Sequence, residues 1–237
     1  MTTNILELTS IDKHFGDGDS RVNALQGINL TVGIGELVAL IGPSGSGKST
    51  LLSIAGALLT PTNGQVLLDG ANITQRSSAE RTQLRLAKYG FIFQGSNLIS
   101  YLTGREQMLF IAHLIGLPGA EAERRADRLL HDLGMTDRAG HYPEELSGGQ
   151  RQRIAIARSL MNDPRIILAD EPTASLDSVR GRQVVEMLAK EVHEREKGGI
   201  LVTHDERLID LCDRVVRITD GLLHEDETVG AARAVAV

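Results

Sequence analysis

One glycine-rich stretch of the chain carries a single lysine followed by two hydroxyl residues, and it fits the pattern G-x-x-x-x-G-K-[ST]. Glycines let the backbone curl so that successive N–H groups point into one hollow, which suits a polyphosphate. Lys48 can reach the β- and γ-phosphates, and the Ser49 hydroxyl can ligate Mg²⁺. The alternative is a plain turn between a strand and a helix. We interpret the stretch as nucleotide-binding, with these residues at the site: Gly42, Pro43, Ser44, Gly45, Ser46, Gly47, Lys48, Ser49 and Thr50.

Two adjacent carboxylates, Asp170 and Glu171, follow the apolar run 166–169. In a parallel sheet, ligands bind at the carboxyl ends of the strands. Asp170 there would hold Mg²⁺ through water, and Glu171 would act as a general base toward the attacking water. The other interpretation is a strand that ends in a solvated acidic turn, but the company of the glycine-rich loop favours the catalytic one.

The elements that must position these residues follow from hydrophobic patterning. Partial alternation predicts antiparallel strands over 5–15 and 27–32, and an uninterrupted apolar run predicts a buried strand over 37–41. Strands and helices then alternate, apart from a mainly helical middle between 79 and 158, which predicts an α/β fold with a parallel core sheet. The remaining expected elements are strands over 64–70, 166–169, 200–202 and 215–218, and helices over 49–59 and 179–197.

Composition narrows the function classes. The chain has 237 residues, a formal net charge of -6 and one cysteine, Cys212. A net acidic chain is a poor candidate for nucleic-acid binding by phosphate neutralisation, so we expect no nucleic-acid partner. No apolar run approaches the ~20 residues that span a bilayer, and no signal-peptide pattern opens the chain. We therefore expect a cytoplasmic protein without direct membrane insertion.

A second glycine motif names a family. The segment Leu146, Ser147, Gly148, Gly149 and Gln150 resembles the signature of the ATP-binding-cassette (ABC) ATPases. An ordinary Ser–Gly helix cap would explain this segment if it stood alone. In the family, the signature closes on ATP held by a second copy, which implies a homodimer.

Four further features match the family in order and spacing, and the resemblance covers residues 5 to 225. Gln94 matches the Q-loop, and His204 matches the switch histidine that contacts the γ-phosphate. Phe15 lies where the family stacks adenine, although tyrosine is commoner there and Phe15 could be plain core. The D-loop that crosses the dimer interface corresponds to Ser175, Leu176 and Asp177.

The resemblance implies the architecture and the roles of the site. The expected fold is a P-loop NTPase core with a parallel sheet, an N-terminal antiparallel β lobe and an inserted α-helical subdomain. We expect one domain, 1–237, with its core in 1–88 and 159–237 and the helical subdomain in 89–158. The cofactors implied are ATP and Mg²⁺. The expected catalytic residues are Glu171, His204, Lys48 and Gln94, and the expected metal ligands are Ser49, Gln94 and Asp170.

The amino-acid sequence of several segments is similar to that of lipoprotein-release, macrolide-export and haem-export ATPases. These segments are 90–94, 97–98, 102–103, 142–146 and 168–173. Arg105 departs from the small residue expected at its position. This resemblance implies a peripheral subunit on the cytoplasmic side of the cell (inner) membrane that drives a separate permease, expected in two copies. Candidate cargos are haem, a lipoprotein, a hydrophobic drug or a peptide. The segment 98–109 would offer an apolar partner surface or pack internally. The alternative function is a soluble ABC ATPase of the iron–sulfur-assembly kind with soluble partners.

Overall fold

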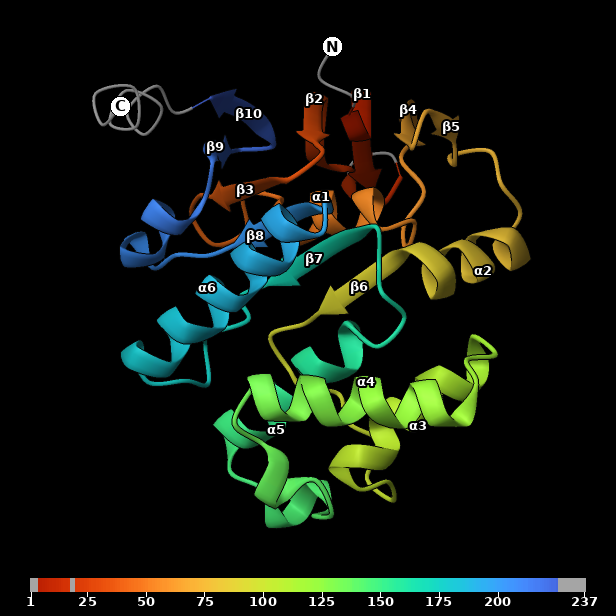
Figure 1. Ribbon diagram of the computed structural model, residues 1–237. Coiled ribbons are helices and arrows are strands. Elements are labelled where there is room, and N and C mark those ends of the chain that lie inside the picture. Colours follow the sequence, from red (N-terminus) through yellow and green to blue (C-terminus); the bar gives the residue numbers. More distant parts are fainter. Residues whose placement is uncertain (1–3, 18–19, 226–237) are drawn as a thin grey trace.

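The computed structural model describes residues 4–17 and 20–225, and it contains two β-sheets with a helix between them (Figure 1). The larger sheet has the strand order β10-β9-β3-β8-β7-β6. Only the β9–β10 pair is antiparallel; the other pairs are parallel. Its strands are β3 (Glu36–Ile41), β6 (Tyr89–Ile92), β7 (Ile166–Asp170), β8 (Gly198–Val202), β9 (Arg214–Thr219) and β10 (Leu222–Glu225).

The second sheet is antiparallel and has the order β2-β1-β4-β5. It forms the N-terminal β lobe that the sequence predicts. Helix α1 (Lys48–Ala55) packs between the two sheets, with Leu51, Leu52 and Ile54 buried. The strands of this lobe are β1 (Asn4–Phe15), β2 (Val22–Gly33), β4 (Asn63–Leu68) and β5 (Ala71–Asn72).

Alternating side chains of the parallel strands supply two separate cores. On β3, Val38 and Leu40 join the cluster that contains α1 and the antiparallel sheet. Leu37, Ala39 and Ile41 point the other way, into the cluster formed with the helices. This period of two is the geometry of an extended strand, and burial on both faces explains why β3 reads as an uninterrupted apolar run.

Helices α3, α4 and α5 lie in the predicted inserted part, and Figure 1 shows them gathered at the end of the molecule opposite the antiparallel sheet, while α6 packs in the same core from the C-terminal part of the chain. Reciprocal side-chain and backbone hydrogen bonds begin α2 at Ser77 and Glu80, and α3 at Thr103 and Glu106. The helices are α2 (Ser78–Lys88), α3 (Gly104–Leu114), α4 (Gly119–Asp132), α5 (Gly148–Ser159) and α6 (Ser178–Glu194), with short 3₁₀ turns η2 (Thr136–Arg138), η3 (Pro143–Glu145) and η4 (Glu206–Leu211).

Several boundaries differ from the sequence-based expectation: β2, for example, begins at Val22 instead of residue 27, and β10 was not expected. Tyr89–Ile92 is an edge strand of the parallel sheet, so the division at residue 89 assigns this strand to the helical subdomain although it belongs to the core sheet. Helix α1 ends at Ala55 because Ala57 takes a left-handed conformation, and α6 ends at Glu194 because Glu196 does the same. Chain reversals that depend on single left-handed residues other than glycine leave little trace in a periodicity pattern.

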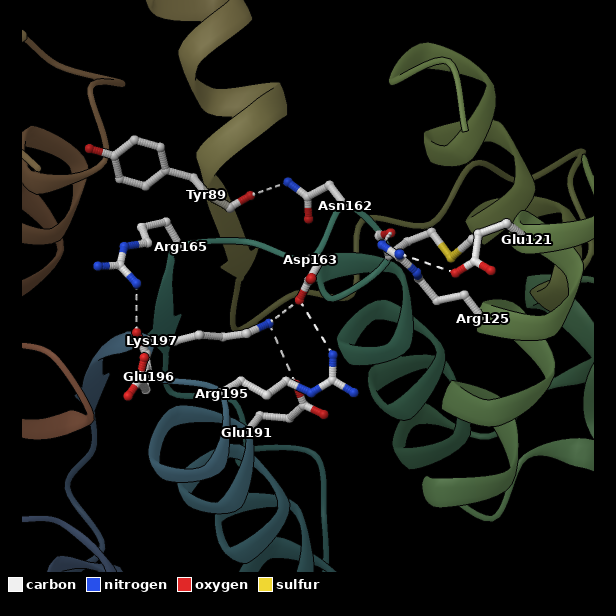
Figure 2. A network of polar contacts seen from close by, with 11 residues as sticks. Tyr89, Glu121, Arg125, Asn162, Asp163, Arg165, Glu191, Arg195, Glu196 and Lys197 are labelled. Carbon is white, nitrogen blue, oxygen red and sulfur yellow. Dashed lines mark hydrogen bonds and ion pairs between the residues drawn. The ribbon is translucent and has the colours of Figure 1, made fainter. Parts of the chain in front are cut away.

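A polar network ties the helical part to the amino-terminal edge of the parallel sheet (Figure 2). The buried ammonium of Lys197 lies 2.6 Å from Asp163 Oδ1 and 3.5 Å from Glu191 Oε2. Arg195 contacts the same two carboxylates, at 3.6 Å and 3.2 Å. From α4, Arg125 donates to the Met161 carbonyl at 3.2 Å. Two cations and two anions thus hold the turn between α5 and β7 against the end of α6.

Candidate functional site

The predicted chemical residues meet at the carboxyl edge of the parallel sheet because each follows a different strand of it. Lys48 is the first residue of α1, directly after the glycine-rich loop that follows β3, and Asp170 is the last residue of β7. Gln94 follows β6 and His204 follows β8, each by two residues. Parallel pairing brings these strand ends to one edge, which is where ligands bind in open α/β sheets.

The glycine-rich loop turns directly into α1. Gly47 is the N-cap, with φ 107° and no side-chain cap, so the first N–H groups of α1 are not taken by a capping side chain. A Cβ on Gly47 would lie 2.6 Å from the Ala24 carbonyl oxygen, so only glycine fits. Lys48 Nζ donates to the carbonyl oxygens of Gly42 at 2.8 Å and Pro43 at 2.7 Å. The loop therefore holds both an ammonium and a helix N-terminus, the combination that binds phosphate.

A cavity of about 490 Å³ lies over this loop. Of the residues predicted to bind, Gly42, Pro43 and Ser46 support the loop without lining the cavity. Sequence reasoning missed the contributions of β2 and of the β9–β10 turn. Predicted residues on its wall are Ser44, Gly45, Gly47, Lys48, Ser49, Thr50, Gln94, Asp170 and Glu171, and the missed ones are Val22, Asn23, Ala24, Asp220 and Gly221.

The same cavity collects oxygen atoms suited to a hard cation. The Ser49 hydroxyl, the Gln94 amide and the Asp170 carboxylate all lie on its wall. Mg²⁺ takes oxygen ligands and keeps several waters, so a site built from a few side-chain oxygens beside phosphates fits it. The three residues that the sequence nominated as metal ligands are therefore brought to one cavity.

Glu171 and His204 face each other across the cavity edge. His204 Nδ1 lies 3.4 Å from Glu171 Oε1, and the Glu171 carboxylate is largely shielded while the histidine side chain is exposed. The backbone of Glu171 is left-handed, with φ 47°, and its N–H donates to the Val202 carbonyl at 3.0 Å. A left-handed conformation in a residue other than glycine costs energy and gathers at functional sites, which fits the role of a held catalytic base.

The loop after His204 has its own support. Asp205 forms two charge-assisted hydrogen bonds with the Arg207 guanidinium, at 2.8 and 2.7 Å. The hydrogen bond from Arg207 holds the pKa of the Asp205 carboxyl below its ordinary value. The Asp205 N–H donates to the Thr203 hydroxyl at 3.0 Å. These contacts fix the backbone on the C-terminal side of His204.

The signature and the D-loop lie against each other, away from the cavity wall. A Cβ on Gly149 would lie 3.0 Å from Leu176 Cδ2 and 3.3 Å from the Ser175 carbonyl oxygen. Ser147 and Gln150 cap α5 reciprocally, at 3.3 and 2.8 Å. The two motifs, Leu146 to Gln150 and Ser175 to Asp177, therefore form one surface. Neither motif lines the cavity of the same chain.

Two side chains of α5 that sequence reasoning missed connect the signature helix to the segment around Gln94. The buried Gln152 donates from Nε2 to the Phe93 carbonyl at 2.9 Å. Arg158 donates to the carbonyls of Asn97 at 2.8 Å and Ser96 at 3.1 Å, and burial lowers the pKa of its guanidinium. Gln152 lies between Arg151 and Arg153 in the polar first half of α5, so no sequence signal marked it as buried.

Phe15 ends β1, and its Cα partner in the register is Val22, which lines the cavity. Phe15 itself is 45% exposed and is not a lining residue, and the ammonium of Lys13 lies 5.2 Å from its ring centroid. An exposed ring at the end of a strand rules out the interpretation as core. Stacking on adenine stays a prediction.

The described part of the chain contains no helix long and apolar enough to cross a membrane.

Residues 25–174 match a family described as ABC transporter. The chain is 49% identical over 216 residues to the putative hemin import ATP-binding protein HrtA of Staphylococcus haemolyticus, covering 91% of this chain and 97% of the relative. It is 46% identical to the protein of the same name from Staphylococcus aureus strain MRSA252, with the same coverage.

Solved structures agree with the fold. The dimeric post-hydrolysis state of the ATP-binding cassette MJ0796 bound to ADP and Pi superimposes with a TM-score of 0.86 at 38% identity, covering 93% of this chain and 98% of that one. Structure cbiO1 from Clostridium perfringens, described as part of the ABC transporter complex cbiONQ, gives a TM-score of 0.85 at 30% identity, covering 99% and 92%. The antiparallel lobe and the parallel sheet thus belong to the fold of these structures.

Proposed function

The chain belongs to the ABC transporter family as an ATP-hydrolysing subunit, and on this premise we propose that it drives the export of haem through a separate membrane permease. The observation that carries the proposal is a cavity shared by the phosphate loop, Gln94 and the Asp170–Glu171 pair, in a chain nearly half identical to hemin-transport ATP-binding proteins over almost their full length.

In this proposal, the residues of the cavity divide the chemistry among them. Lys48 and the N–H groups of α1 bind the β- and γ-phosphates, and Glu171 accepts a proton from the attacking water. His204, beside the base, donates a hydrogen bond to the γ-phosphate. Ser49, Gln94 and Asp170 would hold Mg²⁺, which would supply positive charge beside the transferred phosphoryl group.

ABC ATPase subunits work as dimers with a membrane permease. We therefore assign one surface of this chain to a second copy and another to the permease. The signature–D-loop surface would complete the ATP site of a second copy, because none of its residues lines the cavity of its own chain. Tyr101, 75% exposed, and Phe93, 38% exposed, flank the Gln94 segment and would meet the permease, expected in two copies. Leu98 and Leu109 pack on the helical core and are not available for this.

Cargo and direction rest on separate arguments. Haem follows from the names of the relatives, which read hemin import. We propose transport out of the cell because the amino-acid sequences around Gln94 and before the signature resemble those of export ATPases. We place the assembly at the cytoplasmic side of the cell (inner) membrane. The iron–sulfur-assembly alternative draws no support from these relatives.

Two experiments test the proposal. The Glu171→Gln variant, held closed with MgATP, should retain an integral membrane protein from detergent-solubilised membranes of the native host. Recovery of soluble proteins alone would instead support the iron–sulfur-type alternative.

For the direction, cells that lack the chain should accumulate more hemin than wild type and grow poorly in its presence. Lower hemin accumulation in those cells would mean import, and unchanged accumulation would remove haem as the cargo.

A further inference from the structure

Two hairpins of this chain use the same two-residue turn. Asp69 and Gly70 connect β4 to β5, and Asp220 and Gly221 connect β9 to β10. The φ angles are 47° and 75° in the first turn and 49° and 76° in the second. Positive φ at both positions is the geometry of a type I′ turn, for which Asp-Gly is a preferred sequence. Judged by the local backbone, the two turns are interchangeable.

Their surroundings differ. A Cβ on Gly70 would meet nothing within 4 Å. A Cβ on Gly221 would lie 2.8 Å from the Ala24 carbonyl oxygen and 3.3 Å from Leu25 Cα, in the backbone of β2. Gly221 is buried, and with Asp220 it lines the nucleotide cavity. Gly70 therefore has open space beside it, although Asp69 is ion-paired with Arg165 and Lys88, whereas Gly221 is packed inside the site.

Backbone hydrogen bonds connect the second turn to two neighbours. The Gly221 N–H donates to the Ser46 carbonyl in the phosphate loop at 3.1 Å. The Gly221 carbonyl accepts from the Gln26 N–H of β2 at 2.9 Å, and the Gln26 side-chain amide donates to the Asp220 carbonyl at 3.2 Å. The turn thus lies between β2 and the phosphate loop and is bonded to both.

The Ala24 carbonyl is enclosed by two glycines at once. Besides Gly221, it faces Gly47, whose added Cβ would lie 2.6 Å away. Three backbone segments therefore approach as closely as main chains can: β2, the start of α1 and the β9–β10 turn. Packing without side chains leaves no soft group to absorb a displacement, so a shift of the turn must move the loop or the strand.

We propose that the Asp220–Gly221 turn positions the phosphate loop for ATP, with Gly221 as the positioning residue. It holds the Ser46 carbonyl from one side and β2 from the other, and so fixes the hollow in which the phosphates bind. Since the wall of the cavity includes Asp220, Gly221 and residues 22–24, the turn also sets the distance between the loop and the β2 side of the site. This inference rests on the proposed assignment of the cavity to MgATP.

The two hairpins supply their own matched controls. Alanine at Gly221 or Gly70 introduces the same backbone strain, but at Gly221 it also pushes on Ala24. We expect Gly221→Ala to raise the Kd of the fluorescent analogue mant-ATP about tenfold, because a displacement on the order of 1 Å is costly in a preorganised site. Gly70→Ala should leave that Kd within about twofold while lowering the melting temperature. Equal Kd changes in the two variants would overturn the proposal.

Asparagine separates strain from collision. Asn tolerates the left-handed conformation, so Gly70→Asn should recover stability. Gly221→Asn keeps the added Cβ and should therefore keep the weak nucleotide binding. Recovery of mant-ATP affinity in Gly221→Asn would show that the close packing has no role.

A milder change covers the case in which the Gly221 variants fail to fold. Gln26 is exposed, and Gln26→Ala removes only the side-chain bond to the Asp220 carbonyl. It should raise the KM for ATP by about twofold or more with little change in kcat, the mark of altered ground-state binding. Unchanged KM would count against the proposal. Lys48→Ala distinguishes failure of the proposed MgATP site from failure of the proposed role of the turn. If wild-type and Lys48→Ala chains bind mant-ATP equally, the assignment of the cavity to MgATP is wrong, whatever the Gly221 variants show.

Discussion

The two helix N-termini that carry the glycine motifs are built in opposite ways. Helix α1 starts behind Gly47 with no side-chain cap and with a lysine at its first position. Helix α5 starts behind Ser147, whose hydroxyl accepts the Gln150 N–H while Gln150 returns a bond to Ser147. The first terminus opens into a cavity of its own chain; the second is capped by its own side chains, and none of its residues lines that cavity. In the proposed dimer, the first terminus would bind the phosphates of the ATP held by its own chain, and the second would contact the ATP held by a partner.

The largest effect should come from Lys48. In Lys48→Ala, the cavity loses the ammonium that faces the β- and γ-phosphates, and we expect turnover to fall by roughly 10²-fold or more, as for other electrostatic groups aimed at a transition state. ATP hydrolysis by the purified chain measures this. Lys190→Ala, an exposed lysine on α6, is the control and should hydrolyse ATP at the wild-type rate. Full activity in Lys48→Ala would contradict the assignment of the phosphates to the α1 terminus.

Ser147 tests the other terminus. Asp and Asn both cap helices as well as Ser, so neither variant should lower the melting temperature much. Ser147→Asp places a negative charge where the partner's phosphates should arrive, and we expect turnover roughly tenfold or more below that of Ser147→Asn. Binding of mant-ATP to the single chain should stay unchanged in both. Weakened binding in the monomer would mean that the signature serves its own cavity.

The connection between the two halves passes through Gln152. Gln152→Leu keeps the apolar bulk but leaves the Phe93 carbonyl without its donor, which should cost about 1–3 kcal/mol of stability. We expect turnover to fall a fewfold with unchanged ATP affinity, because the segment around Gln94 loses its bond to the signature helix. The exposed Gln183→Leu on α6 is the control. Loss of stability with unaltered turnover would leave Gln152 a purely structural residue.

The smallest effect concerns the network at the opposite edge of the sheet (Figure 2). Burial raises the pKa of the Asp163 carboxyl, but the hydrogen bond from Lys197 and the charges of Lys197, Arg195 and Arg125 outweigh it and hold the pKa below its ordinary value. A depressed pKa contributes stability above the unfolded pKa, and this is lost as the pH falls through the folded one.

Since Asp163 is 48% exposed, screening limits this contribution to about 1 kcal/mol or less. Urea unfolding at about pH 6 and about pH 3 should show a larger acid loss in wild type than in Asp163→Asn. Nucleotide binding near neutral pH should be the same in both. An equal decrease in the free energy of unfolding in both proteins would mean that the Asp163 carboxylate does not stabilise the fold.

Sequence order predicted one half of the site better than the other. Lys48, Gln94, Asp170, Glu171 and His204 lie at or just after strand ends, and parallel pairing brings such positions together whatever the detail of the fold. No comparable rule predicts the part of the cavity wall that β2 and the β9–β10 turn form. Ala24 and Gly221 meet through backbone packing between strands nearly two hundred positions apart in the sequence, and no side-chain pattern announces a contact made by a carbonyl and a glycine.

Local chemistry explains the remaining differences. Tyr89–Ile92 is a short strand flanked by helical patterns, so periodicity alone assigns it to the helical part, and only its pairing with β7 reveals it. The caps of α2, α3 and α5 have the Ser/Thr-to-Glu/Gln spacing of a capping box, a local signal that the hydrophobic patterning did not use. Phe15 was placed correctly at the end of a strand, but its exposure depends on the register with β2.

The central claim is that each ATP lies between the phosphate loop of one chain and the signature of another. Mixing Lys48→Ala with Ser147→Asp tests it, because a mixed dimer combines both defects in one site and leaves the other site intact. We predict that the mixture hydrolyses ATP well above the sum of the two variants measured separately. A mixture that stays at that sum would mean that the signature does not complete the site of its partner.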